Sequence, residues 1–207
     1  APAGPARFLP YHGAVPGAYQ YLPLERVIFG KPAAQAAAEE AARIGANRVF
    51  VVSSKTLSRS TDEISRIRKS LGSAYAGLFD ECIAHTPGPS VPAAAAAVRE
   101  AKPDLILTVG GGTPIDTVKI LEILLGHEVT DLWGKETLRS ETKPSPVRQV
   151  VIPTTLSGAE FSNIGGGTDP RTRLKDSFSG ADVGARLVVP RPPEPGQPRP
   201  RGGARPR

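Results

Sequence analysis

Residues 105–119, with the sequence LILTVGGGTPIDTVK, carry residue types that could bind a phosphate group. The three glycines allow a sharp turn at the end of an apolar strand and let the backbone approach a bulky anion without a Cβ in the way. Thr113 is predicted to cap the following helix, with Pro114 at its first position and Asp116 closing a capping box. The free N–H groups and the positive end of that helix would favour a pyrophosphate.

The same pattern could be a purely structural turn between a strand and a helix. It matches neither the GxGxxG fingerprint nor the GxxxxGK[ST] phosphate loop. Its longer form is more specific, because GGGTP followed by Asp116 and then by Val118 and Lys119 resembles a segment of the iron-containing alcohol dehydrogenases. Their relatives, the glycerol dehydrogenases and maleylacetate reductases, share this segment.

A second segment at the distance expected for this family strengthens the resemblance. Residues 153–160, PTTLSGAE, are similar to the family's PTT segment, which ends in Gly, a small residue and Glu. The RVIFG sequence at 26–30 and the HTP sequence at 85–87 also resemble the family, so the likeness covers residues 24–189. The PTT segment is closer to that of maleylacetate reductases and GGGTPID to that of alcohol dehydrogenases, which leaves the subfamily open.

The resemblance implies an NAD(P)-dependent dehydrogenase that interconverts an alcohol and a carbonyl compound by hydride transfer. Pyrophosphate would lie on the glycine turn, adenosine beside the threonines of PTT, nicotinamide near the serine, and a ribose hydroxyl near a lysine. We expect cofactor contacts at Gly110, Gly111, Gly112, Thr113, Asp116, Thr154, Thr155, Ser157 and Lys175. The structural alternatives are that the threonines end a strand, that Ser157 and Glu160 form a capping box, and that Lys175 is a solvated cation.

The end of the second predicted strand bears on the choice between NAD and NADP. NAD-selective relatives often place an acid there to hold the ribose 2′-hydroxyl, whereas this chain has Ser53, Ser54 and Lys55. An acid would repel a 2′-phosphate, but these side chains could hydrogen-bond to it and neutralise it. We therefore expect contacts from Ser53 and Ser54 and at least equal binding of NADP(H).

Strands and helices alternate along the chain around these segments. This alternation predicts an α/β fold with a doubly wound, mostly parallel, Rossmann-like sheet. The predicted strands are residues 26–29, 48–54, 105–109, 149–152 and 186–189, with a weaker one at 77–83. The predicted helices are residues 32–44, 62–71, 92–101 and an amphipathic one at 115–125, with a helical turn at 157–161 and a turn at 165–169.

We expect three regions: an irregular arm at 1–23, a dinucleotide-binding domain at 24–189 and a disordered Pro- and Arg-rich tail at 190–207. The tail holds five Arg and one Glu, so it carries +4 of the formal net charge of +6. It could be a basic interaction tail or, as we favour, an out-of-frame read of GC-rich DNA. The nearly neutral remainder argues against nucleic acid as a partner.

The resemblance implies iron or zinc held by one Asp and three His in an all-helical second domain. Nothing after Val189 matches that domain, and the three histidines, His12, His85 and His127, are not spaced as ligands. We therefore expect no metal site and no catalytic residue, weak dinucleotide binding, little or no activity, and exposed apolar surface that favours aggregation or a homodimer.

The remaining features indicate a cytoplasmic protein without a membrane span. No apolar run approaches the length of a bilayer-spanning helix, the first ten residues lack a signal-peptide layout, and the single cysteine, Cys82, cannot form an internal disulfide. Two alternatives to a dehydrogenase of this kind stay open. One is a non-catalytic dinucleotide-binding module, and the other is a maleylacetate reductase-like enoate or carbonyl reductase.

Overall fold

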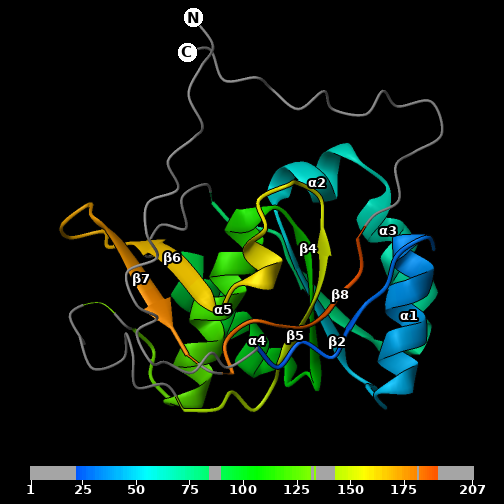
Figure 1. Cartoon of the computed structure of the whole chain (residues 1–207), viewed down its shortest axis with the longest axis horizontal. Helices are drawn as coiled ribbons and strands as arrows, with labels where there is room; N and C mark the ends of the chain where they lie inside the picture. The colour runs from blue at the N-terminus through cyan, green and yellow to red at the C-terminus, as the bar shows by residue number, and fades with distance from the viewer. Residues whose placement is uncertain (1–21, 84–89, 132, 134–142, 181, 191–207) are drawn as a thin grey trace, which may run out of the picture.

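The centre of the protein is a parallel sheet with helices on both faces (Figure 1). The structure is a computed structural model, and it describes residues 22–83, 90–131, 133, 143–180 and 182–190. The sheet strands are β1 (Arg26–Val27), β2 (Val49–Ser53), β3 (Tyr75–Phe79), β4 (Leu105–Gly110), β5 (Gln149–Pro153) and β8 (Ala185–Val188). They lie in the order β1-β8-β5-β4-β2-β3, with every neighbouring pair parallel. The doubly wound, Rossmann-like prediction is confirmed.

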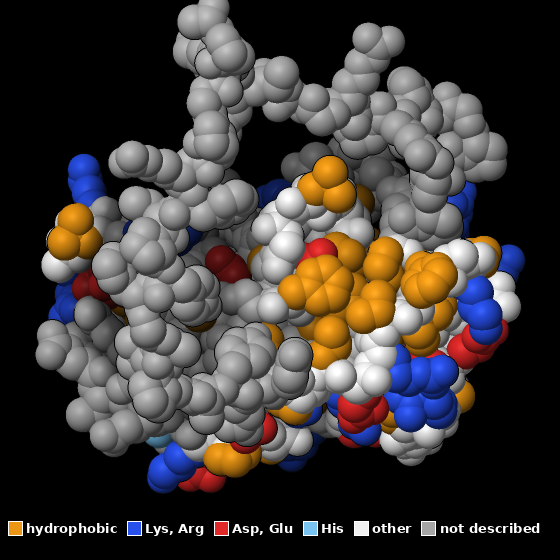
Figure 2. All heavy atoms as spheres, in the orientation of Figure 1, with side chains coloured by type: hydrophobic (Ala, Val, Ile, Leu, Met, Phe, Trp, Pro, Cys, Tyr) orange, Lys and Arg blue, Asp and Glu red, His pale blue; other side chains and the backbone are white. Residues whose placement is uncertain are grey.

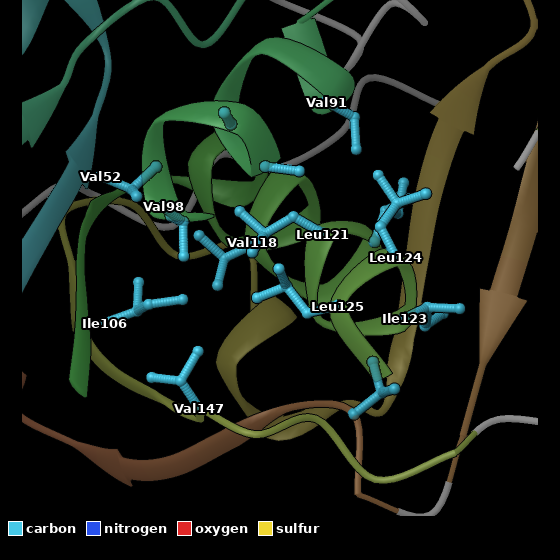
Figure 3. Packing of buried hydrophobic residues seen from close by; sticks show 14 of the residues in the cluster. Val52, Val91, Val98, Ile106, Val118, Leu121, Ile123, Leu124, Leu125 and Val147 are labelled. Carbon is cyan, nitrogen blue, oxygen red and sulfur yellow. The ribbon is translucent and has the colours of Figure 1, made fainter. Parts of the chain in front are cut away.

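Alternate residues of the central strands face opposite helical layers. Val49 and Val51 pack in the cluster that contains α1 and α3, whereas Phe50 and Val52 pack with α4 and α5. Figure 3 shows Val52 beside residues of α4 and α5. Burial on both faces explains the nearly unbroken apolar runs of the central strands. The longer helices are α1 (Ala33–Arg43), α3 (Glu63–Leu71), α4 (Ser90–Ala101) and α5 (Gly112–Gly126).

A hairpin that the sequence did not predict lies against α5 (Figure 1). Its antiparallel strands are β6 (Ile164–Thr168) and β7 (Lys175–Ser179). The prediction of a turn at residues 165–169 is therefore wrong. The glycines of β6 serve close packing instead, because a Cβ on Gly165 would lie 3.1 Å from the Cβ of Lys119 on the helix.

Helix α5 is buried on nearly all sides rather than amphipathic as predicted. The sheet and α4 cover one side and the hairpin covers the other, so that even Lys119 and Glu122 are buried. The short helix α2 (Lys55–Ser60) was not predicted, and Ser54 caps it by accepting a hydrogen bond from the amide of Leu57. Its polar sequence buries no residue, so no apolar stripe marks it.

Several expected segments fall outside the described residues. They are the arm up to residue 21, the HTP sequence at 85–87 and the tail from residue 191. Within the described parts of the chain, no helix is long and apolar enough to cross a membrane.

The buried carboxyl group of Glu122 joins α5 to the sheet. Its two oxygens accept hydrogen bonds from the amides of Gln149, at 2.9 Å, and Gly184, at 3.3 Å. Burial raises the pKa of Glu122 from 4.5 to about 8, although these backbone donors and nearby cations oppose the shift. Between these two values the folded protein binds more protons than the unfolded chain.

Stability is therefore predicted to fall as the pH rises from 4.5 to about 8. Urea unfolding at a series of pH values would measure this fall. Glu122→Gln cannot titrate, so its unfolding midpoint should depend less on pH over that window than the wild-type midpoint. Equal pH dependence in the two proteins would contradict the assignment to Glu122.

Candidate functional site

The turn between β4 and α5 lies where the chain reverses its direction across the sheet. From β2 the chain passes outward to β3, then returns to β4 on the other side of β2 and continues to β5. In open α/β sheets, ligands bind at such a switch point, outside the carboxyl ends of the strands. The predicted glycine turn thus lies at the position where a ligand is expected on topological grounds.

Glycine is required at the first turn position by both conformation and space. Gly110 has a φ of +154°, and a Cβ there would lie 2.7 Å from the Pro114 ring. Gly111 is the N-cap residue, and its own Cβ would lie 2.8 Å from the Thr155 hydroxyl oxygen. Side chains at either position would force the turn, or the loop that faces it, to move.

The helix begins two residues earlier than predicted. Gly111, rather than Thr113, is the N-cap, and no side chain caps the helix, so the expected capping box of Thr113 and Asp116 is wrong. Pro114 lies at the third helical position instead of the first. The tight glycine turn starts the helix without a side-chain cap, and proline is tolerated there because first-turn N–H groups have no intrahelical acceptor.

The N-terminus of α5 therefore offers backbone donors at a partly exposed surface. Gly111, Gly112 and Thr113 are each partly exposed. The amide of Ile115 bonds back to the carbonyl of Gly111, at 3.4 Å, but the amides of Gly112 and Thr113 precede the first intrahelical bond. These two N–H groups, together with the positive end of the helix dipole, suit an anion.

The loop after β5 lies over this helix end. Thr154 donates its amide to the carbonyl of Gly110 at 2.9 Å, and the exposed Thr155 side chain stands against Gly111. Ser157, also exposed, has its hydroxyl oxygen 3.7 Å from the position of a Cβ on Gly112. The structure thus brings both threonines and the serine of the PTT segment to the glycine turn.

The alternative role of Ser157 in a capping box is not observed. The short 3-10 helix η3 (Ala159–Phe161) has Gly158 as its N-cap and no side-chain cap. Ser157 instead accepts a 3.4 Å hydrogen bond from the amide of Ala159. The helical turn predicted in this region is confirmed in part.

Asp116 and Lys175 meet at Gly166 on the hairpin. One carboxylate oxygen of Asp116 accepts a 3.2 Å hydrogen bond from the amide of Gly166, and the other lies 3.6 Å from Nζ of Lys119. Cε of Lys175 lies 2.5 Å from where a Cβ on Gly166 would be. Lys175 is exposed at the start of β7, beside the first turns of α5.

At the end of β2 the two serines have structural partners. Ser53 is fully buried, and its hydroxyl donates to the carbonyl of Val109 at 2.9 Å. Ser54 caps α2, and Lys55 begins that helix as an exposed residue.

An acid that sequence reasoning missed, Asp80, follows β3 and accepts a 2.5 Å hydrogen bond from Ser58. The sequence did not mark Asp80 because the predicted strand, residues 77–83, extended past it, whereas β3 (Tyr75–Phe79) ends just before it.

The side chains in the described part of the chain do not fit iron or zinc, the metals that the sequence resemblance implies. No three His, Cys, Asp or Glu side chains gather there in a metal-binding arrangement. His127 caps the C-terminus of α5 and accepts a 3.0 Å hydrogen bond from the amide of Lys143, while His12 and His85 lie outside the described residues. Cys82 is buried, which raises the pKa of its thiol to about 12.

Apolar side chains gather on another part of the surface, over β1, β8 and η3 (Figure 2). Val27 is 40%, Phe29 79% and Phe161 52% exposed. A cavity of about 310 Å³ adjoins this face, with Phe161 and Ala185 in its wall. Because Ala185 begins β8, the cavity lies toward the N-terminal ends of the parallel strands. The glycine turn lies at their carboxyl ends.

Comparisons with known proteins agree with this architecture and these segments. Residues 24–192 match the family described as iron-containing alcohol dehydrogenase. The chain is 32% identical over 162 residues to Dehydrogenase FUM7 of Gibberella moniliformis, an alignment that covers 72% of this chain and 38% of that protein. The fold and the sequence match together show that the chain belongs to the iron-containing alcohol dehydrogenase family, whose members are oxidoreductases.

Solved structures share the fold. Maleylacetate reductase from Agrobacterium tumefaciens has a TM-score of 0.66 at 26% identity, covering 86% of this chain and 43% of its own. Sulfoacetaldehyde reductase from Bifidobacterium kashiwanohense, solved in complex with NAD+, has a TM-score of 0.74 at 19% identity, with coverages of 85% and 46%. The chain thus spans less than half the length of the relatives it matches.

Proposed function

We propose that this chain binds NAD or NADP by seating the diphosphate on the N-terminus of α5. The observation that carries the proposal is the close contact between Gly111 and Thr155, which leaves no room for a side chain on Gly111. Family membership and the NAD+ complex of sulfoacetaldehyde reductase support the same ligand. A dinucleotide would place two negative charges beside backbone donors that have no intrahelical partner.

The residues around the turn have distinct roles in this proposal. Gly110 and Gly111 keep the surface free of side chains, and the amides of Gly112 and Thr113 donate to the diphosphate. Thr154 and Thr155 line the adenosine side, and Ser157 lies toward the nicotinamide. Lys175 reaches a ribose hydroxyl, and Asp116 supports it by holding Gly166.

For the whole protein we propose hydride transfer between the dinucleotide and a small alcohol or carbonyl compound. The described residues do not assemble a metal site, and we propose that this chain alone is weakly active or inactive. Maleylacetate reductase-like reduction is the second candidate, favoured by the solved relative of that name. A non-catalytic dinucleotide-binding module would share the site without the reaction.

We propose that residues 24–189 form the dinucleotide-binding domain, between an arm and a separate basic tail. The apolar side chains over β1, β8 and η3 support self-association as a homodimer. A cytoplasmic location is supported by the lone cysteine, which cannot form an internal disulfide.

Gly111→Ala is predicted to weaken NADH binding by about tenfold or more, equivalent to about 1.4 kcal/mol. The added Cβ must displace Thr155 or enter the space of the diphosphate. Calorimetric titration would measure the change in Kd. Gly45→Ala is the control for affinity: Gly45 follows α1 on the other face of the sheet, and its φ of +74° makes alanine costly for stability, but the Kd should stay unchanged. Equal affinity for Gly111→Ala and wild type would contradict the site.

We propose further that NADP(H) binds at least as well as NAD(H). Burial of Ser53 makes Lys55, exposed at the start of α2, the principal partner for a 2′-phosphate. Lys55→Glu is predicted to weaken NADPH binding by about tenfold while changing NADH binding little, because only NADPH carries the added charge. A wild-type preference for NADH of more than about tenfold would overturn this choice of cofactor.

A further inference from the structure

The ammonium group of Lys119 is enclosed between α5 and two segments that reach the candidate site. Its side chain has no exposed surface. Nζ donates to the carbonyl of Ala159 at 2.7 Å and to that of Ile164 at 2.9 Å, and it lies 3.6 Å from a carboxylate oxygen of Asp116. A protonated amine has three N–H donors, which matches these three acceptors.

The acceptors belong to the parts of the chain that carry the proposed cofactor contacts. Ala159 comes two residues after Ser157, and Ile164 is the first residue of the hairpin that presents Lys175. Asp116 binds that hairpin again through the amide of Gly166. One buried ammonium group thus connects the helix whose N-terminus faces the diphosphate with both flanking segments.

A buried cation is an inefficient way to stabilise a core. Burial lowers the pKa of Lys119, while Asp116 and the more distant Glu122 and Glu160 oppose that shift. Replacing a buried ion pair with apolar side chains is often neutral or stabilising. Lys119 therefore contributes more by fixing the positions of neighbouring segments than by stabilising the fold. The directional bonds of Lys119 fix where the loop and the hairpin lie, which an apolar contact would not do.

We infer that Lys119 is a positioning residue that holds Ser157 and Lys175 over the N-terminus of α5, so that both can contact a bound dinucleotide. This inference rests on the proposed function. Lys119 itself does not touch the ligand. Its effect on binding passes through the loop after β5 and through the hairpin, and loss of its bonds releases both.

A double-mutant cycle between Lys119 and Lys175 tests this role. Lys119→Met and Lys175→Ala are each predicted to weaken NADH binding about tenfold, and the double variant to bind no more weakly than Lys119→Met alone. A merely structural Lys119 would lower stability but leave the effect of Lys175→Ala unchanged in both backgrounds. That additive result would overturn the inference.

Trp133 supplies a second readout. It is the only tryptophan, and its ring makes an edge-to-face contact with Phe178 of β7, with centroids 5.6 Å apart. In Lys119→Met the hairpin should shift and change the emission of Trp133, whereas Lys69→Met, at an exposed position of α3, should leave emission and affinity unchanged. Wild-type emission in folded Lys119→Met would also count against the inference.

The experiments also distinguish a folding defect in the variant from failure of the proposed function. If Lys119→Met does not fold, Lys119→Gln removes the charge and shortens the side chain while keeping N–H donors, and the same cycle with Lys175→Ala applies. Additivity there overturns the inference as well. If neither Gly111→Ala nor Lys175→Ala alters NADH binding, the proposed function fails, whereas intact single effects with an additive cycle remove only the role of Lys119.

Discussion

The close approach between the end of β4 and the loop after β5 is the constraint on which the site depends. At Gly110 and Gly111 the space that a Cβ would need is taken by Pro114 and Thr155. Because both residues are glycines, the chain can pass from strand to helix within two residues and start α5 with its first amides at the surface. A wider turn would move those amides away from the carboxyl ends of the strands at the point where the strand order reverses.

Burial of α5 is the second requirement, and it links the fold to the site. The sheet fixes one side of the helix, and the hairpin of β6 and β7 covers the other. The glycines of β6 let the hairpin approach closely enough for Lys119 and Asp116 to bond to it. The same packing that removes a helix face from water thus brings Lys175 toward the glycine turn.

Much of this arrangement could be predicted from the sequence, for identifiable reasons. Strands β2 and β4 are buried on both faces, so their apolar runs are nearly unbroken, and the glycine triplet marks the turn after β4. The hairpin was missed because its glycines serve packing, yet in the sequence they resemble a turn. The burial of Lys119 was missed because a lysine on a helix is usually solvated, and the two segments that enclose it, the loop after β5 and the hairpin, lie far along the chain.

The central claim is that a diphosphate binds at the amides that begin α5. An NMR titration of the isotope-labelled chain with NADH tests it most directly, because amide shifts report new hydrogen bonds residue by residue. The account predicts that the largest shift changes occur at Gly112 and Thr113, with smaller ones at Thr155 and Ser157. Saturable binding that leaves Gly112 and Thr113 unshifted would contradict it.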